Sequence, residues 1–163
     1  MIDPDWLTRA RNYLGTKEIP GKGDAPIIQQ WLRRLGAWWN DDATPWCGTF
    51  VATVMRDSGY EIPRAWYRAL AWADWGIALE TPRVGCIVVY ERQGGGHVGF
   101  VVGLDQDCRL LTLGGNQRDS VCVLPFDRWR AIAYRWPAEA VALIDRAPLP
   151  RIAWGGPAST QEA

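Results

Sequence analysis

The sequence predicts an α+β fold in which N-terminal helices pack on one face of a C-terminal antiparallel sheet. Two observations predict it. The first half places apolar residues at helical spacing, whereas the second half holds short β-type runs separated by Gly, Asp, Asn and Pro. Because no helix separates these runs, we expect neighbouring strands to be antiparallel, with the helices on one side.

Four helices are expected in the first half, and proline or glycine residues mark most of their ends. They cover residues 4–15, 26–36, 46–59 and 66–75. Asp3 and Pro4 suit the N-cap and first position of the first helix, and Gly15 ends it.

Five strands are expected in the second half, with a short helical turn near Asp127. They cover residues 86–90, 98–102, 110–113, 121–124 and 131–136. We predict a single domain over residues 1–137. The Pro- and Ala-rich extension over residues 138–163 is expected to be partly flexible.

Composition excludes several classes of protein. The chain has 163 residues, and its 18 basic and 18 acidic side chains balance, which argues against a nucleic-acid partner. The apolar runs are too short to cross a bilayer, so no membrane insertion is expected. The N-terminus lacks the pattern of a Sec-type signal peptide, which predicts a cytoplasmic location as synthesised.

The numbers of tryptophan, histidine and cysteine residues limit which metal sites and disulfides the chain can form. There are 11 Trp, a single His and four Cys without a C-x-x-C pair. The cysteines are therefore expected to be free thiols, and no metal or other cofactor is predicted. A zinc site made from His97 and several cysteines is a minor alternative.

Cys47 is a candidate nucleophile because it lies at the first turn of the third predicted helix. The helix dipole and unpaired backbone N–H groups there favour the thiolate and can also hold an oxyanion. The alternative is that Cys47 is a small apolar residue that packs the start of the helix.

His97 and Asn116 are candidate partners of Cys47. His97 follows three glycines at the entry to a strand, where an imidazole can act as a general base. Asn116 follows Gly114 and Gly115 at the end of the next strand, and its amide can fix the tautomer of His97. The alternatives are a surface histidine and an ordinary turn asparagine.

The order Cys, His, Asn resembles that of the NlpC/P60 and CHAP group of papain-like cysteine peptidases. Within that group, the sequence is more closely similar to a phage-associated branch. The matching segments cover residues 14–21, Asp42, 45–47, 73–76, 82–89, 96–100 and 114–117. The most specific are Pro-Trp-Cys at 45–47 and Gly-His-Val-Gly-Phe at 96–100. The resemblance spans about residues 5–137.

The resemblance implies that Cys47 is the nucleophile, His97 the general base and Asn116 the residue that orients His97. Four further positions belong to the matching motifs or adjoin them, and we expect them in or beside the cleft: Glu18, Asp42, Trp46 and Gly96. For Glu18 and Asp42 we favour a role in bracing a loop.

The activity implied is hydrolysis of an amide in the peptide part of bacterial peptidoglycan by a monomeric enzyme. Two bonds fit: the amide between the lactyl group and L-Ala, and a peptide bond within the stem or cross-bridge. A phage endolysin released by a holin is the preferred setting, with action at the cell wall. A secreted effector controlled by an immunity protein is the alternative.

Two further alternatives remain open. A non-catalytic wall- or glycan-binding module would use tryptophans as a platform, for which Trp38 and Trp39 are the best candidates. Papain-like scaffolds also host acyl transferases and deamidases, so the fold alone does not determine the reaction.

Overall fold

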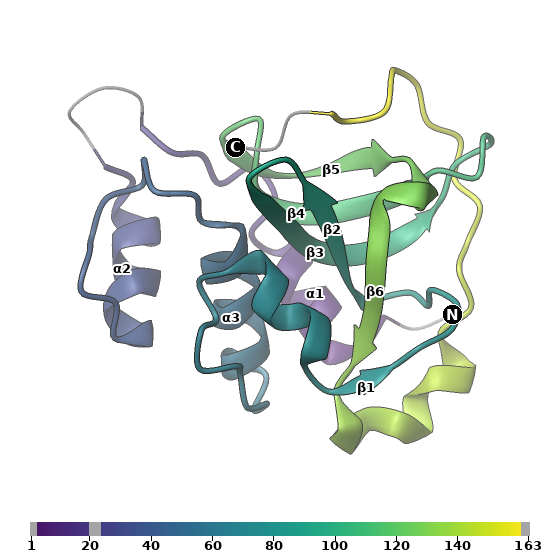
Figure 1. Cartoon of the computed structure of the whole chain (residues 1–163), viewed down its shortest axis with the longest axis horizontal. Coiled ribbons are helices and arrows are strands. Elements are labelled where there is room, and N and C mark those ends of the chain that lie inside the picture. The colour runs from purple at the N-terminus through teal and green to yellow at the C-terminus, as the bar shows by residue number, and fades with distance from the viewer. Residues whose placement is uncertain (1–2, 20–23, 161–163) are drawn as a thin grey trace.

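The computed structural model describes residues 3–19 and 24–160 and has the α+β architecture that the sequence predicts (Figure 1). Its α-helices are α1 (Asp5–Arg11), α2 (Pro26–Leu35) and α3 (Cys47–Asp57), and its 3₁₀ segments are η1 (Ala69–Asp74), η2 (Arg128–Arg130) and η3 (Ala138–Arg146). Its strands are β1 (Ile77–Ala78), β2 (Ile87–Arg92), β3 (Gly95–Leu104), β4 (Leu110–Gln117), β5 (Ser120–Phe126) and β6 (Ala131–Trp136).

The strands form one six-stranded sheet in the order β1-β6-β2-β3-β4-β5, and every neighbouring pair is antiparallel. β2, β3, β4 and β5 follow one another as a meander. The last strand, β6, returns to the opposite edge beside β2, where β1 pairs with it.

Helix α3 joins the helical layer to the sheet. Its residues from Cys47 to Met55 are all buried, and it contacts both β3 and β4. This approach depends on Gly115 of β4, since a β-carbon there would lie 2.6 Å from Cβ of Phe50 and 2.9 Å from the Trp46 ring. The small residue therefore lets the start of α3 lie directly on the sheet.

Helix boundaries differ from the prediction at both ends of the first helix and at the fourth helix. The first helix, α1, ends at Arg11 and not at residue 15. Pro4 takes the N-cap position of α1, and Asp3 instead forms an ion pair with Arg11 at 2.6 Å. The fourth expected helix is a shorter 3₁₀ segment, η1. Trp66 lies outside it and accepts a hydrogen bond from the indole N–H of Trp72 through its carbonyl oxygen. Short 3₁₀ segments are common in the connections between longer helices and strands.

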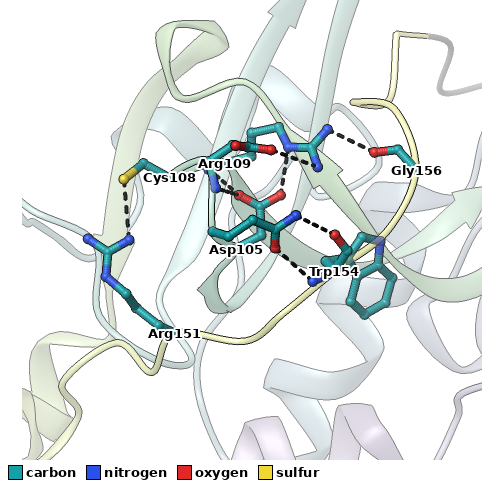
Figure 2. Close-up of polar contacts among 8 residues, drawn as sticks. Asp105, Cys108, Arg109, Arg151, Trp154 and Gly156 are labelled. Atoms are coloured by element: carbon teal, nitrogen blue, oxygen red, sulfur yellow. Dashed lines mark hydrogen bonds and ion pairs between the residues drawn. The ribbon is translucent and has the colours of Figure 1, made fainter.

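Residues 138–160 make defined contacts with the sheet. Residues 138–146 form η3, and Arg151 makes a parallel bridge with Leu104. Figure 2 shows the guanidinium of Arg109 between the carboxylate of Asp105 and the carbonyl of Gly156. The domain boundary at residue 137 stays a prediction, but the extension lies against the β3–β4 hairpin.

The cysteines, the metal-ligating residue types and the helices each give one further finding. All four cysteines are free thiols, as expected. Among residues 3–19 and 24–160, no group of three His, Cys, Asp or Glu side chains is placed to hold a metal ion. No described helix is long and apolar enough to span a membrane.

Candidate active site

Cys47 is the first residue of α3, and its side chain is only 5% exposed. Burial raises the pKa of this thiol, but a hydrogen bond with His97 and the charge of His97 lower it. Backbone N–H groups of Val98 and Gly48 lower it further, so the net pKa lies below the ordinary value. The structure therefore favours a thiolate at Cys47.

His97 lies on β3, opposite Tyr90 of β2, and is fully buried. Its ring is parallel to that of Phe126, with centroids 5.5 Å apart, and nearly parallel to that of Tyr90 at 6.3 Å. The guanidinium of Arg130 lies over the Phe126 and Tyr90 rings. This packing holds the imidazole in one plane.

Gln117 at the end of β4 is hydrogen-bonded through its side chain to the outer ring nitrogen of His97. Its Oε1 atom lies 2.9 Å from Nε2 of His97, and both side chains are buried. The amide nitrogen of Gln117 donates to the carbonyl oxygens of Thr112 at 3.2 Å and Cys122 at 2.8 Å. The Gln117 side chain is thus bonded at both ends.

These bonds determine the tautomer of His97. Two carbonyl oxygens can only accept, so the group that faces them must be the NH₂ of Gln117, and the oxygen must face the ring. An amide oxygen also only accepts, so Nε2 of His97 carries a proton. In the neutral ring Nδ1 is then the basic nitrogen, available to the thiol of Cys47.

Gly114 provides the space for this contact. A β-carbon at Gly114 would overlap Oε1 of Gln117, and would lie 2.9 Å from Cδ of Gln117 and 3.1 Å from Nε2 of His97. The missing side chain therefore leaves room for an amide from further along the strand.

Asn116 lies on the same strand, at a point where the regular pairing of β4 with β5 is interrupted. Gly114 pairs with Cys122 and Gln117 with Ser120, so the register shifts by one residue between them. Asn116 lies in this bulge with φ 58° and is buried. Regular alternation would put Asn116 on the face of Gly114, but the extra residue puts Gln117 there instead.

The sequence interpretation placed the residue that orients His97 in this turn and named Asn116, and it did not single out Gln117. The relevant indication was the Gly114–Gly115 pair, which is typical of a bulge and changes which later side chain faces His97. The role of Asn116 in orienting His97 stays a prediction, and the structure provides a second candidate for that role.

Glu18 lies in the segment between α1 and α2, and Asp42 lies in the segment between α2 and α3. Glu18 accepts a hydrogen bond from the indole N–H of the buried Trp46 at 2.9 Å. Burial, with the nearby charges of Asp119 and Asp42, raises the pKa of Glu18, although the bond from Trp46 opposes this. The contact fixes the residue immediately before Cys47.

Asp42 is 3% exposed and holds two chain segments together. Its Oδ2 atom accepts hydrogen bonds from the backbone N–H groups of Ile19 and Ala25, both at 2.8 Å. This is the bracing arrangement favoured for Asp42 from the sequence.

Gly96 precedes His97 on β3 and lies under η1. A β-carbon there would lie 2.7 Å from Cδ2 of Leu70 and 2.9 Å from the carbonyl oxygen of Tyr90. A hollow of about 500 Å³ adjoins it, lined by residues 94–96, Ala65 and residues 68–71. Gly96 therefore borders a cavity one residue from His97.

Together these residues make a buried thiol, a base with one defined tautomer and a helix N-terminus. That set suits nucleophilic attack on a carbonyl carbon, with proton transfer by the imidazole and backbone N–H groups for the oxyanion.

Comparison with known proteins gives one family. The CHAP domain matches residues 39–116, which include Cys47, His97 and Asn116. This match confirms the resemblance to the CHAP group, whereas the phage-associated branch stays a prediction. No curated protein and no solved structure matches the chain.

Proposed function

We propose, from the CHAP domain over residues 39–116, that this chain is a cysteine hydrolase that cleaves an amide bond in the peptide part of peptidoglycan. The CHAP domain supports a hydrolase that acts on peptidoglycan. The observation that carries the finer proposal is the contact of Cys47 with His97, whose outer nitrogen is bonded to Gln117.

The first half of the reaction forms a thioester. The Cys47 thiolate attacks the carbonyl carbon, and a C–S bond forms while the carbonyl oxygen becomes an oxyanion. Backbone N–H groups at the start of α3 stabilise this charge. Nδ1 of the His97 imidazolium then gives its proton to the amine nitrogen as the C–N bond breaks.

The second half releases the acid. Nδ1 of His97 takes a proton from water, whose oxygen attacks the thioester carbon. The C–S bond breaks, the carboxylic acid leaves and the Cys47 thiolate returns. Throughout, the amide oxygen of Gln117 accepts the Nε2–H bond and keeps Nδ1 directed to the reacting atoms.

Digestion of purified peptidoglycan tests this function. The wild type, Cys47→Ala and the matched control Cys108→Ala, which changes an exposed thiol, are compared by mass spectrometry of soluble fragments. We expect fragments from the wild type and Cys108→Ala only, and their new termini identify the bond. Wall binding by a folded wild type that releases no fragments would support the binding module instead.

For the biological setting we propose an endolysin that reaches the wall after a holin opens the membrane. The support is the resemblance of the motifs to a phage-associated branch. The neighbouring gene tests this proposal: a holin gene supports the endolysin, whereas a gene for an immunity protein supports the secreted effector.

A further inference from the structure

Four aromatic rings beside α3 form one connected group, named here the aromatic cluster: Trp38, Trp39, Trp66 and Tyr67. Trp39 stacks on Trp66 with ring centroids 5.8 Å apart and an interplanar angle of 25°. Trp38 and Tyr67 each meet Trp39 edge-on, at 5.3 Å and 5.5 Å. The cluster thus joins two chain segments far apart in sequence.

The aromatic cluster has one buried ring and two exposed rings. Trp66 is 8% exposed, whereas Tyr67 is 42% and Trp38 is 92% exposed. Such side chains have few rotatable bonds, and here neighbouring rings limit them further, so they lose little conformational entropy on binding a ligand. A fully exposed Trp on a fixed aromatic base is more suited to contact a ligand than to stabilise the core.

The cluster adjoins the reactive residues. A β-carbon at Gly48, the residue after Cys47, would lie 2.5 Å from the carbonyl oxygen of Trp66 and 3.0 Å from the backbone of Tyr67. Figure 1 shows the segment after α3 lying beside that helix. The hollow that borders Gly96 is lined on this side by Ala65 and Arg68, which flank Trp66 and Tyr67. The backbone of Trp66 and Tyr67 therefore lies against the residue that follows Cys47.

The chemistry of the cluster favours a sugar ring over a charged peptide. Flat pyranose faces present C–H groups that pack against aromatic faces, and Arg68, whose guanidinium lies 5.8 Å from the Tyr67 ring centre, can donate to acetamido or hydroxyl oxygens. In peptidoglycan the stem peptide is attached to a sugar. A scissile amide at Cys47 therefore brings the glycan close to this surface.

We infer that the aromatic cluster is a subsite for the N-acetylated amino sugars of the glycan strand. This inference rests on the proposed function and extends it, because the enzyme would then bind the glycan strand as well as the peptide. Trp38 and Tyr67 would then determine specificity through substrate affinity and leave the chemistry at Cys47 unchanged.

Binding to a peptide-free glycan tests the subsite separately from hydrolysis. The probe is a tetrasaccharide of alternating N-acetylglucosamine and N-acetylmuramic acid, titrated calorimetrically into Cys47→Ala protein. Adding Trp38→Ala or Tyr67→Ala is expected to weaken binding roughly tenfold. Adding Trp129→Ala, which removes a Trp that is 82% exposed outside the cluster, is expected to leave binding unchanged.

Wall digestion with Trp38→Ala and an intact Cys47 gives the second readout. We expect a raised KM with kcat within about twofold of the wild type. Equal glycan binding with and without Trp38 and Tyr67 overturns the subsite, even where the wild type cleaves the wall. The subsite is also overturned if Trp38→Ala loses activity only on a glycan-free stem peptide. A change from dimer to monomer on Trp38→Ala would overturn it as well. Glycan binding that depends on Trp38 in a protein that cleaves nothing supports the subsite and overturns the proposed reaction.

Discussion

Gly114 leaves the space that the side-chain amide of Gln117 occupies, and the two residues lie on the same face of β4 although they are three positions apart. The bulge between them makes this possible, since regular alternation would put them on opposite faces. The amide then reaches Nε2 of His97. The glycine and the glutamine thus act as one unit that sets the tautomer of His97.

A double-mutant cycle tests this unit. Gly114→Ala displaces the Gln117 amide and Gln117→Ala removes it, so each is expected to lower kcat by at least about tenfold. Their combination is expected to be no worse than Gln117→Ala alone. Peptidoglycan turnover provides the rates. Gly95→Ala is the control, because no atom lies within 4 Å of a β-carbon there. Additive losses would contradict the unit.

Much of this arrangement could be predicted from the sequence. Apolar periodicity and proline and glycine positions predict the helices and the meander, and the start of α3 makes Cys47 a candidate nucleophile. A single histidine leaves His97 as the only imidazole. These features are local, so spacing and residue type suffice to find them.

The remaining features depend on tertiary contacts. One extra residue in the β4–β5 ladder decides whether Asn116 or Gln117 faces His97, and spacing alone does not show it. The contact of residues 150–160 with the β3–β4 hairpin includes the hydrogen bonds of Arg109 to Asp105 and Gly156, in a stretch that the sequence presents as an ordinary polar turn.

The two candidates for orienting His97 make different predictions. Asn116→Gly keeps the positive φ of the bulge and removes only the side chain, so we expect kcat/KM within about threefold of the wild type. Gln117→Leu removes the acceptor that stabilises the imidazolium. On the alkaline side of the pH profile, the activity of this variant is therefore expected to fall at a lower pH than that of the wild type. The reverse result, with Asn116→Gly shifting the profile, would assign the role to Asn116.

The thiol of Cys47 should react at lower pH than an ordinary cysteine, because His97 and two backbone N–H groups lower its pKa. As pH falls through that lowered pKa, the thiolate is protonated and alkylation stops. By contrast, burial raises the pKa of Cys86 to about 12, so Cys86 should stay unlabelled. Iodoacetamide labelling across pH, located by peptide mass spectrometry, measures both. His97→Ala should move the Cys47 curve to higher pH, and an unmoved curve would contradict the pairing.

Asp42 should contribute to stability and not to the chemical step. Asp42→Ala leaves the backbone N–H groups of Ile19 and Ala25, the second of them buried, without their acceptor, so we expect a loss of about 1 to 3 kcal/mol in the free energy of unfolding. Urea denaturation measures it, with the exposed Asp74→Ala as control. At a temperature where the variant is folded, kcat should stay close to the wild-type value. A large fall in kcat without a loss of stability would place Asp42 in the cleft.

Asp105 should hold the C-terminal extension in place through Arg109. Burial raises the pKa of Asp105, but hydrogen bonds from Arg109 and from the backbone N–H of Asp107 lower it below its ordinary value of 3.8. A lowered pKa means that the ionised carboxylate stabilises the fold above that ordinary value, and this stabilisation disappears as pH falls through the folded-state pKa. Asp105→Asn should therefore unfold at lower urea than the wild type near neutral pH, with the difference vanishing in acid.

The same variant should expose residues 150–160 to proteolysis, because Arg109 then loses the partner that holds it against Gly156. Limited digestion followed by mass spectrometry locates the cleavage sites. Glu80→Gln, at an exposed carboxylate outside this turn, is the control and should leave the digestion pattern unchanged. Equal protection of the extension in Asp105→Asn and wild type would show that its other contacts suffice, among them the bridge between Arg151 and Leu104.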